Sequence, residues 1–533
     1  MATFIIRPHL LHVQCWSAVA LDDHQICRQS TSAGRGYTFF QSGLLASQWM
    51  KLMLKRHVII YLFAHAVPAV IGFAGLIAYT HLVNPAQYGI YVVGQSAAAV
   101  VSMALFGWIR LSVSRYQAED ATVDVRGAVL IGYVITIAAA GTGTLLLLHY
   151  RPSWIDNGQI LIILFTAVCL SAFELSQEFR RATFEAKNFA FVSIIRSFIG
   201  VGLGMAAVFA GWGGRGLLLA LGSSFLLGTV LFAVRTWARP IEPGQIALMR
   251  RFVQYGMPLA LSGIIFAIYA AIDRLAVAYL IGQDAAGQYG VASDLSRQMI
   301  GILAASVGAA VSPIAFRTMT THGADATSEH MVDSFELLLV IIGPVTIWLA
   351  ICGPGFANAV MGRQFSTSVS LLLPILAFAR FFGAITNYYV HVSFQLAERT
   401  SLQLVNAAFM LCLYLVIMVL FVRLWGLPGA AAAALVSELC GLLFGLWLTQ
   451  KGFRFDLGTH RTGQIAISLA SMALASYGAM QMSHSPSENL IYATVLGGLV
   501  YLTALLLFDV AEIRGVIAAR LLPIVLGFSR LRR

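Results

Sequence analysis

Charged side chains are scarce in this sequence. They make up 11% of its 533 residues, whereas hydrophobic side chains make up 59%. Because a soluble globular domain carries charge on about a quarter of its residues, this scarcity excludes a soluble fold. The apolar runs that take the place of charge are long enough to cross a bilayer as helices of about 20 residues. The chain is therefore predicted to be an all-α polytopic membrane protein.

Cysteine and nucleotide-binding motifs are also lacking. The six cysteines are scattered without the spacing of a metal or redox site, and we interpret them as small core residues. No Walker-type glycine loop is present, so we expect no ATP hydrolysis, no cofactor and no metal. The net charge of the chain is +11. In a membrane protein, such an excess of lysine and arginine indicates basic cytoplasmic loops, not nucleic-acid binding.

The first 49 residues differ from the rest of the chain. They contain neither a membrane-spanning run nor the apolar core of a signal peptide. Segment 50–57, which precedes the first apolar run, resembles the start of a membrane protein. We therefore interpret residues 1–49 as an upstream extension, with the native start at Met50 or Met53.

Fourteen membrane helices are expected from the apolar runs. Their ranges are 58–82, 90–109, 127–149, 159–175, 191–210, 217–234, 255–280, 290–312, 334–353, 369–390, 402–422, 429–448, 463–482 and 489–508.

Lysine and arginine are distributed unevenly between the two ends of these helices. With the N-terminus placed in the cytoplasm, the segments on that side hold 23 of these residues, and the opposite loops hold only Arg151, Arg215, Arg363 and Arg423. Positive charge marks cytoplasmic loops, so both termini are predicted to be cytoplasmic. The outer loops are all short, which leaves no room for the catalytic surface of an enzyme.

Three short motifs recur in the same order in the two halves of the chain. Gln87-Tyr88-Gly89 recurs as Gln288-Tyr289-Gly290, segment 209–216 as 421–429, and segment 184–188 as 394–400. Six helices separate each pair, so the halves have the same orientation, as in transporters that bind substrate between parallel repeats. The sequence predicts two six-helix lobes, 50–250 and 251–450, followed in 451–533 by two extra helices and a basic cytoplasmic tail.

Four motifs together resemble those of a known family. They are Asn84-Pro85-Ala86-Gln87-Tyr88-Gly89, Ile272-Asp273-Arg274-Leu275, Gly287-Gln288-Tyr289-Gly290 and Met361-Gly362-Arg363-Gln364-Phe365. Over residues 58–450 the chain resembles the polysaccharide-transporter branch, which includes lipopolysaccharide O-antigen flippases, of the multidrug/oligosaccharidyl-lipid/polysaccharide flippase superfamily. The resemblance implies a central cavity lined mainly by helices 1, 2, 7 and 8. It also implies that the substrate is an oligosaccharide linked to polyprenyl pyrophosphate.

The function predicted from this resemblance is that of a flippase in the bacterial inner membrane. By alternating access between its lobes, it would move the lipid-linked oligosaccharide outward for assembly of lipopolysaccharide O-antigen, capsule or exopolysaccharide. An ion-coupled multidrug exporter of the same superfamily is the alternative, and the short outer loops disfavour a polysaccharide polymerase or ligase. Membrane lipids, a proton or sodium ion, and a separate polymerase of the same pathway are candidate partners.

Four charges lie inside the seventh and eighth expected helices, where an unpaired charge is costly and marks a functional site. They are Asp273, Arg274, Asp294 and Arg297. Similar depths in the membrane predict that Asp273 pairs with Arg297, and Arg274 with Asp294. Such pairs would be a clasp between two helices, or the arginines would bind phosphate or acidic sugar with the aspartates as counter-ions. The sequence supports both interpretations.

Two further groups of charges are candidate site residues. Arg380 and Glu438 are expected at equal depth, either as a structural brace or as an ion-coupling pair in which Glu438 takes up a proton or sodium ion. Arg110 and Arg115 follow the second helix at the cytoplasmic boundary. They suit an anionic pyrophosphate, since arginine binds phosphate through two parallel hydrogen bonds, but basic residues are also ordinary there.

Overall fold

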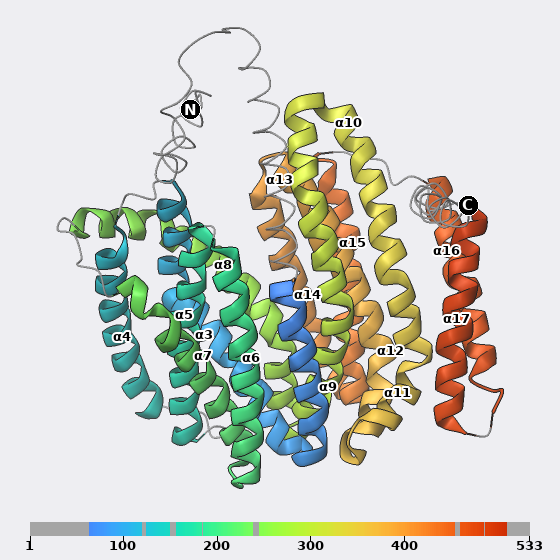
Figure 1. The fold of residues 1–533 in the computed structure, drawn as a ribbon, viewed down its shortest axis with the longest axis horizontal. Helices are drawn as coiled ribbons and strands as arrows, with labels where there is room; N and C mark the ends of the chain where they lie inside the picture. Colours follow the sequence, from blue (N-terminus) through green and yellow to red (C-terminus); the bar gives the residue numbers. More distant parts are fainter. Residues whose placement is uncertain are drawn as a thin grey trace, which may run out of the picture. The chain divides into compact units, whose positions relative to one another are not determined.

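The computed structural model describes residues 63–119, 124–149, 156–183, 185–237, 245–453, 459–483 and 485–508. These residues form helices and turns and no strand (Figure 1). The all-α fold predicted from the sequence is therefore confirmed. The expected extension over residues 1–49 and the basic tail after 508 lie outside the described residues.

The helices divide into a first half, a second half and a terminal pair. The first half contains the helix Phe63–Leu82, α3 (Pro85–Glu119), α4 (Arg126–His149), α5 (Asn157–Ala182), α6 (Ala186–Phe209) and α7 (Gly213–Trp237). The second half contains α8 (Gln245–Leu280), α9 (Gln283–Ser296), η1 (Arg297–Gly301), α10 (Ile302–Ile351), α11 (Gly353–Val360), α12 (Arg363–Ile385), η2 (Thr386–Val390), α13 (His391–Leu396), α14 (Thr400–Trp425) and α15 (Leu427–Thr449). The terminal pair is α16 (Thr459–Ala479) and α17 (Pro486–Phe508).

Twelve helical stretches of the described chain are long and apolar enough to cross a membrane. One of them, Gln283–Ile351, has 69 residues and would be about 100 Å long at 1.5 Å per residue, so it holds more than one crossing. Gly323 divides it, because its φ of 84° lies in the left-handed region where a helix cannot continue. Helix α16 is not among the twelve, although its 21 residues are long enough to span a bilayer.

Several helices begin earlier than hydropathy alone predicts. Helix α3 begins at Pro85 and not at residue 90, because the Asn84 side chain accepts a 2.9 Å hydrogen bond from the backbone N–H of Gln87. Asparagine before a helix and proline at its first position favour this start. Residues 283–287, which the expected helices 255–280 and 290–312 leave in a connection, instead form the first turn of α9 after Gly282, whose φ is 131°.

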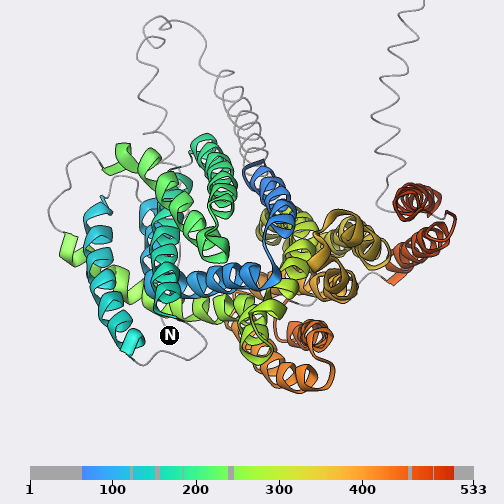
Figure 2. The same ribbon diagram turned by 90° about the horizontal axis from the view of Figure 1, so that it is seen from below.

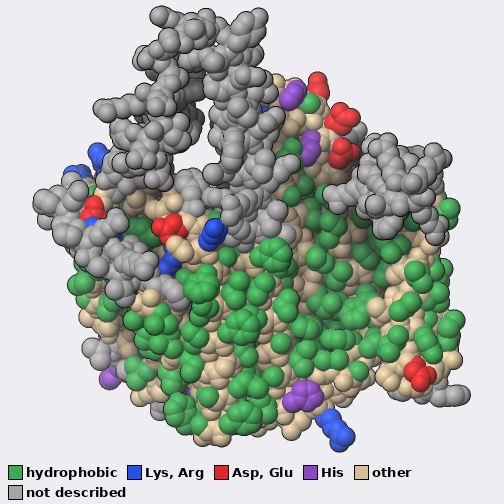
Figure 3. Space-filling view, in the orientation of Figure 1, with side chains coloured by type: hydrophobic (Ala, Val, Ile, Leu, Met, Phe, Trp, Pro, Cys, Tyr) green, Lys and Arg blue, Asp and Glu red, His purple; other side chains and the backbone are tan. Residues whose placement is uncertain are grey.

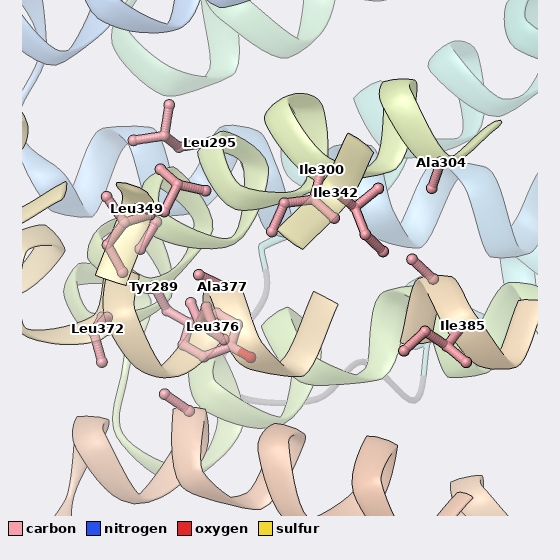
Figure 4. Close-up of a cluster of buried hydrophobic side chains, with 14 of the residues drawn as sticks. Tyr289, Leu295, Ile300, Ala304, Ile342, Leu349, Leu372, Leu376, Ala377 and Ile385 are labelled. Atoms are coloured by element: carbon pink, nitrogen blue, oxygen red, sulfur yellow. The ribbon is translucent and has the colours of Figure 1, made fainter. Parts of the chain in front are cut away.

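The core joins the two halves of the sequence. Helix α3 packs along α8 and α9, and a continuous buried cluster extends from Leu76 in the first helix to Leu505 in α17. Figure 4 shows part of this cluster, where Tyr289 lies among leucines of α10 and α12. Helices α16 and α17 pair with each other and pack against α10 and α11 (Figure 2).

On the face seen in Figure 3, the described residues carry hydrophobic side chains in a broad band across the middle of the helices. Lys, Arg, Asp and Glu gather toward the two ends of the helices. The division of α10 at Gly323 lies at one of these ends and α11 lies at the other (Figure 1). This distribution fits helices that cross a bilayer and expose their ends to water.

Candidate functional site

A charge network joins α8, α9 and α12. Arg274 of α8 is buried, with 4% of its side chain exposed, and its Nη2 donates a 2.6 Å hydrogen bond to Oδ1 of Asp294 in α9. The expected pair of Arg274 and Asp294 is therefore present. The second guanidinium nitrogen of Arg274 donates to Ser96 Oγ in α3 at 3.3 Å, which extends the network into the first half of the chain.

Arg297 shares the same carboxylate. Its Nη2 donates to Oδ1 of Asp294 at 2.7 Å, and 49% of its side chain remains exposed. The expected pair of Asp273 and Arg297 is wrong, because residues three apart on a helix are neighbours and Arg297 turns back to Asp294. One buried aspartate thus holds two arginines, one enclosed and one accessible.

Asp273 pairs instead with Arg380 of α12. Arg380 Nη2 donates to Ser293 Oγ at 2.9 Å and to Asp273 Oδ2 at 3.4 Å, and the Ser293 hydroxyl donates to the same carboxylate oxygen at 3.4 Å. The other carboxylate oxygen of Asp273, Oδ1, accepts a 2.8 Å hydrogen bond from the backbone N–H of Arg274. The four charges of α8, α9 and η1 therefore belong to a five-charge network that includes Arg380.

Glu438 does not pair directly with Arg380, so the expected brace is wrong. Its side chain is buried beside Gly383, where a Cβ atom built on the glycine would lie 2.8 Å from Glu438 Oε2. The Tyr269 side chain is the polar neighbour of this carboxylate. Within the described part of the chain, Oε2 of Glu438 accepts no hydrogen bond. The glycine one turn beyond Arg380 leaves the space that Glu438 fills.

Two π-helical turns interrupt the helices that carry this network. The first, η1, begins at Arg297, and the second, η2, follows α12 after Arg380. In η2 the exposed Asn387 bends back to donate a 2.8 Å hydrogen bond to the carbonyl of Gly383. Wider turns of this kind occur frequently at functional sites, because they redirect side chains locally without ending the helix.

Arg110 and Arg115 do not converge on one site. Arg110 forms an ion pair with Glu174 of α5, and its other guanidinium nitrogen contacts the Met103 sulfur at 3.4 Å. Arg115 faces α8, with its guanidinium 4.5 Å from the centre of the Tyr255 ring. The expected joint cluster is wrong, because residues five apart on a helix project in different directions.

Sequence reasoning missed several polar members of these sites. Ser96, Ser293 and Tyr269 lie in apolar runs and carry no signal that distinguishes them from other small or aromatic helix residues. Glu174 gave one signal, a carboxylate within an expected membrane helix. Among the described residues, no group of three His, Cys, Asp or Glu side chains is arranged to hold a metal ion.

The sequence model of a family described as polysaccharide biosynthesis protein matches residues 81–370. The chain belongs to this family. The matched range covers more than half of the chain and includes Asp273, Arg274, Asp294 and Arg297, but ends before Arg380 and Glu438. The resemblance inferred from the motifs is thus confirmed. No curated protein sequence matches the chain.

Solved structures share the fold at low sequence identity. A structure titled "Lipid II flippase MurJ, inward closed conformation" is 13% identical, with a TM-score of 0.70 over 84% of this chain and 99% of that one. A mutant of the MATE transporter VcmN of Vibrio cholerae is 16% identical, with a TM-score of 0.51 over 75% and 95%. This member of the polysaccharide biosynthesis family therefore shares its fold with the flippase and the transporter of these two structures.

Proposed function

We propose that this protein moves a lipid-linked oligosaccharide across the bacterial inner membrane for surface polysaccharide assembly. Its substrate would be a polyprenyl pyrophosphate-linked glycan used for lipopolysaccharide O-antigen, capsule or exopolysaccharide. The observation that carries the proposal is Arg297: an accessible guanidinium within an apolar helix, fixed by a buried carboxylate. Membership of a polysaccharide biosynthesis family supports a glycan rather than a drug as cargo.

Each charge of the network has a distinct part in this proposal. Asp294 orients Arg297, whose planar guanidinium suits a phosphate oxygen pair. Arg274 neutralises Asp294 from the buried side, so that the carboxylate does not repel an incoming phosphate. Asp273 and Arg380 fix α8 against α12 and keep that half rigid during transport.

Contacts between the two halves close one end of the molecule. The backbone N–H of Gly362 donates to Thr80 Oγ at 3.1 Å, and His81 Nε2 lies 2.9 Å from the carbonyl oxygen of Val360. In the proposed orientation, with both termini cytoplasmic, this is the outer end. Closure at the outer end supports alternating access, in which lobe 50–250 rocks against lobe 251–450 and the glycan enters from the cytoplasmic side.

Glu438 is the proposed coupling residue. A buried carboxylate with one oxygen lacking a hydrogen bond is stabilised by taking up a proton or a sodium ion. Its position near Arg380 would let that uptake alter the contacts of α12. Membrane lipids and a polymerase of the same pathway complete the proposed set of partners.

The experiment that tests the function is complementation of a deletion strain. A plasmid copy of the gene should restore surface polysaccharide, and the deletion strain should accumulate the lipid-linked oligosaccharide in the cytoplasmic leaflet. Sensitivity to a panel of cationic drugs, measured in the same strains, is the matched readout for a multidrug exporter. Unchanged surface polysaccharide together with increased drug sensitivity in the deletion strain would sink the flippase proposal and favour the exporter.

A further inference from the structure

A pocket of about 460 Å³ opens in the first half of the chain, between α3, α5 and α6. It lies apart from the charge network, and its polar lining comes from Arg110, Glu174, Gln177, Glu178, Arg181 and Ser193. Its volume is within the range of small-molecule sites, which is about 300–1,000 Å³. Pockets of this size that combine apolar walls with a few fixed polar groups are candidate binding sites.

The charges of the pocket balance one another. Arg110 pairs with Glu174, and Arg181 donates to Glu178 at 3.1 Å. These pairs remain open to a ligand, since 37% of the Glu174 side chain and 54% of the Arg181 side chain are exposed. Because each carboxylate is matched by a guanidinium group, the lining offers no net positive charge to a pyrophosphate and favours an uncharged ligand with many hydroxyl groups. Such a ligand can donate to the carboxylates and accept from the guanidinium groups.

The floor of the pocket is preorganised. Gln177 is buried, its Nε2 donates to Ser193 Oγ at 2.7 Å and to the carbonyl oxygen of Phe189 at 3.3 Å, and its Oε1 accepts from Arg180 at 3.2 Å. The Arg181 guanidinium lies 5.5 Å from the centre of the Phe189 ring. Because Gln177 uses both of its N–H groups in these bonds and Phe189 is buried, they form a rigid floor. The partly exposed Glu174 and Arg181 are the groups that can meet the hydroxyl groups of a sugar.

The position of the pocket fits a ligand at the cytoplasmic membrane surface. Arg181 is in the last turn of α5, and Phe189 is in the first turn of α6. Positive charge places this end of the helices in the cytoplasm. A glycan attached to a lipid of the inner leaflet would meet this pocket before any residue deeper in the membrane.

We propose that this pocket is a subsite for an uncharged sugar unit of the lipid-linked oligosaccharide. The inference rests on the proposed function and adds a division of labour to it. The neutral pocket of α3, α5 and α6 selects the glycan, while Arg297 binds the phosphate.

The test measures glycan binding to the full-length protein in lipid nanodiscs. The probe is the phosphate-free oligosaccharide released by mild acid from the surface polysaccharide of the producing bacterium, detected by saturation-transfer NMR. Ser114 of α3 also lines the pocket, so Ser114→Phe fills it without removing either ion pair. Gln177→Leu removes the fixed amide at nearly constant volume. Each variant should weaken oligosaccharide binding at least tenfold. Asp156→Asn, which alters the exposed ion pair with Arg215 of α7 at the opposite end of α5, should bind normally.

Folding and competing ligands are controlled separately. Thermal unfolding of each variant must match the unaltered protein, and inorganic pyrophosphate should not compete with the oligosaccharide. Normal oligosaccharide binding by well-folded Ser114→Phe would overturn the subsite. Binding of phosphoethanolamine without binding of the oligosaccharide would also overturn it and would identify a pocket for a phospholipid headgroup. If the gene restores surface polysaccharide but the oligosaccharide does not bind, the subsite fails alone. If the gene restores none, the proposed function fails as well.

Discussion

Two arginines of the charge network differ sharply in their surroundings. Arg274 is enclosed between α3, α8 and α9, whereas Arg297 holds the same aspartate but keeps half of its side chain accessible. Removing one partner of a buried pair costs about 3–5 kcal/mol, because the other charge is left uncompensated. An accessible arginine carries no such penalty. The two residues are therefore expected to fail in different ways when substituted.

The substitution Arg297→Lys is expected to leave membrane abundance normal and to lower surface polysaccharide export at least tenfold. Lysine keeps the charge but loses the planar pair of donors, and a hydrogen bond to a charged group contributes about 1.5–3 kcal/mol. The measurement is surface glycan in the deletion strain, with protein level determined in parallel. The control, Arg274→Ala, should lower the protein level itself. A normal protein level with poor export in that control would contradict the different roles assigned to Arg274 and Arg297.

The pairing of Asp273 with Arg380 leads to a second prediction. Asp273→Asn alone should lower the thermal stability of the purified protein, because Arg380 is left without its carboxylate. Adding Arg380→Gln should recover part of the loss, since the double variant buries no unpaired charge. Adding Arg297→Gln in place of Arg380→Gln should recover nothing, because Arg297 pairs with Asp294. Recovery of stability by Arg297→Gln would show that Asp273 pairs with Arg297, as depth in the membrane alone predicts.

At the scale of elements, glycines let the starts of α3 and α9 touch. A Cβ atom built on Gly89 would lie 1.8 Å from the carbonyl oxygen of Gln283, and one built on Gly287 would lie 1.9 Å from that of Pro85. Because both obstacles are backbone atoms, a larger residue must push the helices apart. Gly89 ends the first Gln-Tyr-Gly motif and Gly287 immediately precedes the second, so the two motifs lie where the starts of α3 and α9 meet.

The substitution Gly89→Ala is expected to open this closure and to reduce export. Spin labels on cysteines at Leu82 and Gln364, each two residues beyond the hydrogen-bonded Thr80 and Gly362, should show a longer mean distance than in the unaltered protein. Gly141→Ala is the matched control, because a Cβ atom there meets nothing within 4 Å. An unchanged distance in a stable Gly89→Ala protein would show that these helices do not form the closure.

At the scale of the whole molecule, the distribution of positive charge predicts which end faces the cytoplasm. A single cysteine at Ser366, near the start of α12, should react with an impermeant thiol reagent in intact cells. A cysteine at Thr320, beside the division of α10 at Gly323, should react only after the cells are opened. A cysteine at Arg423, at the end of α14, should behave like Ser366. The reverse labelling pattern would show that the protein has the opposite orientation in the membrane, with the closed end on the cytoplasmic side.

The sequence by itself determined the membrane class, the approximate helices and the family. Hydrophobic length is a local property, so a run such as 402–422 corresponds to one helix, in this case α14. Helix ends were less accurate, because the side-chain cap of Asn84 before Pro85 and the positive φ of Gly282 set them, and hydropathy registers neither. The pair of Arg274 and Asp294 was also predictable, since a hairpin brings equal depths together.

Only the tertiary structure decided the other partners of the buried charges. Depth along a helix can be counted from the sequence, but rotation about its axis depends on how side chains pack. Arg380 and Glu438 lie at similar counted depths, yet Arg380 turns toward Asp273 and Ser293 while Glu438 fills the space beside Gly383. The same applies to the pocket of Arg110, Glu174 and Gln177. Its residues come from three helices, and only packing fixes which faces of those helices meet.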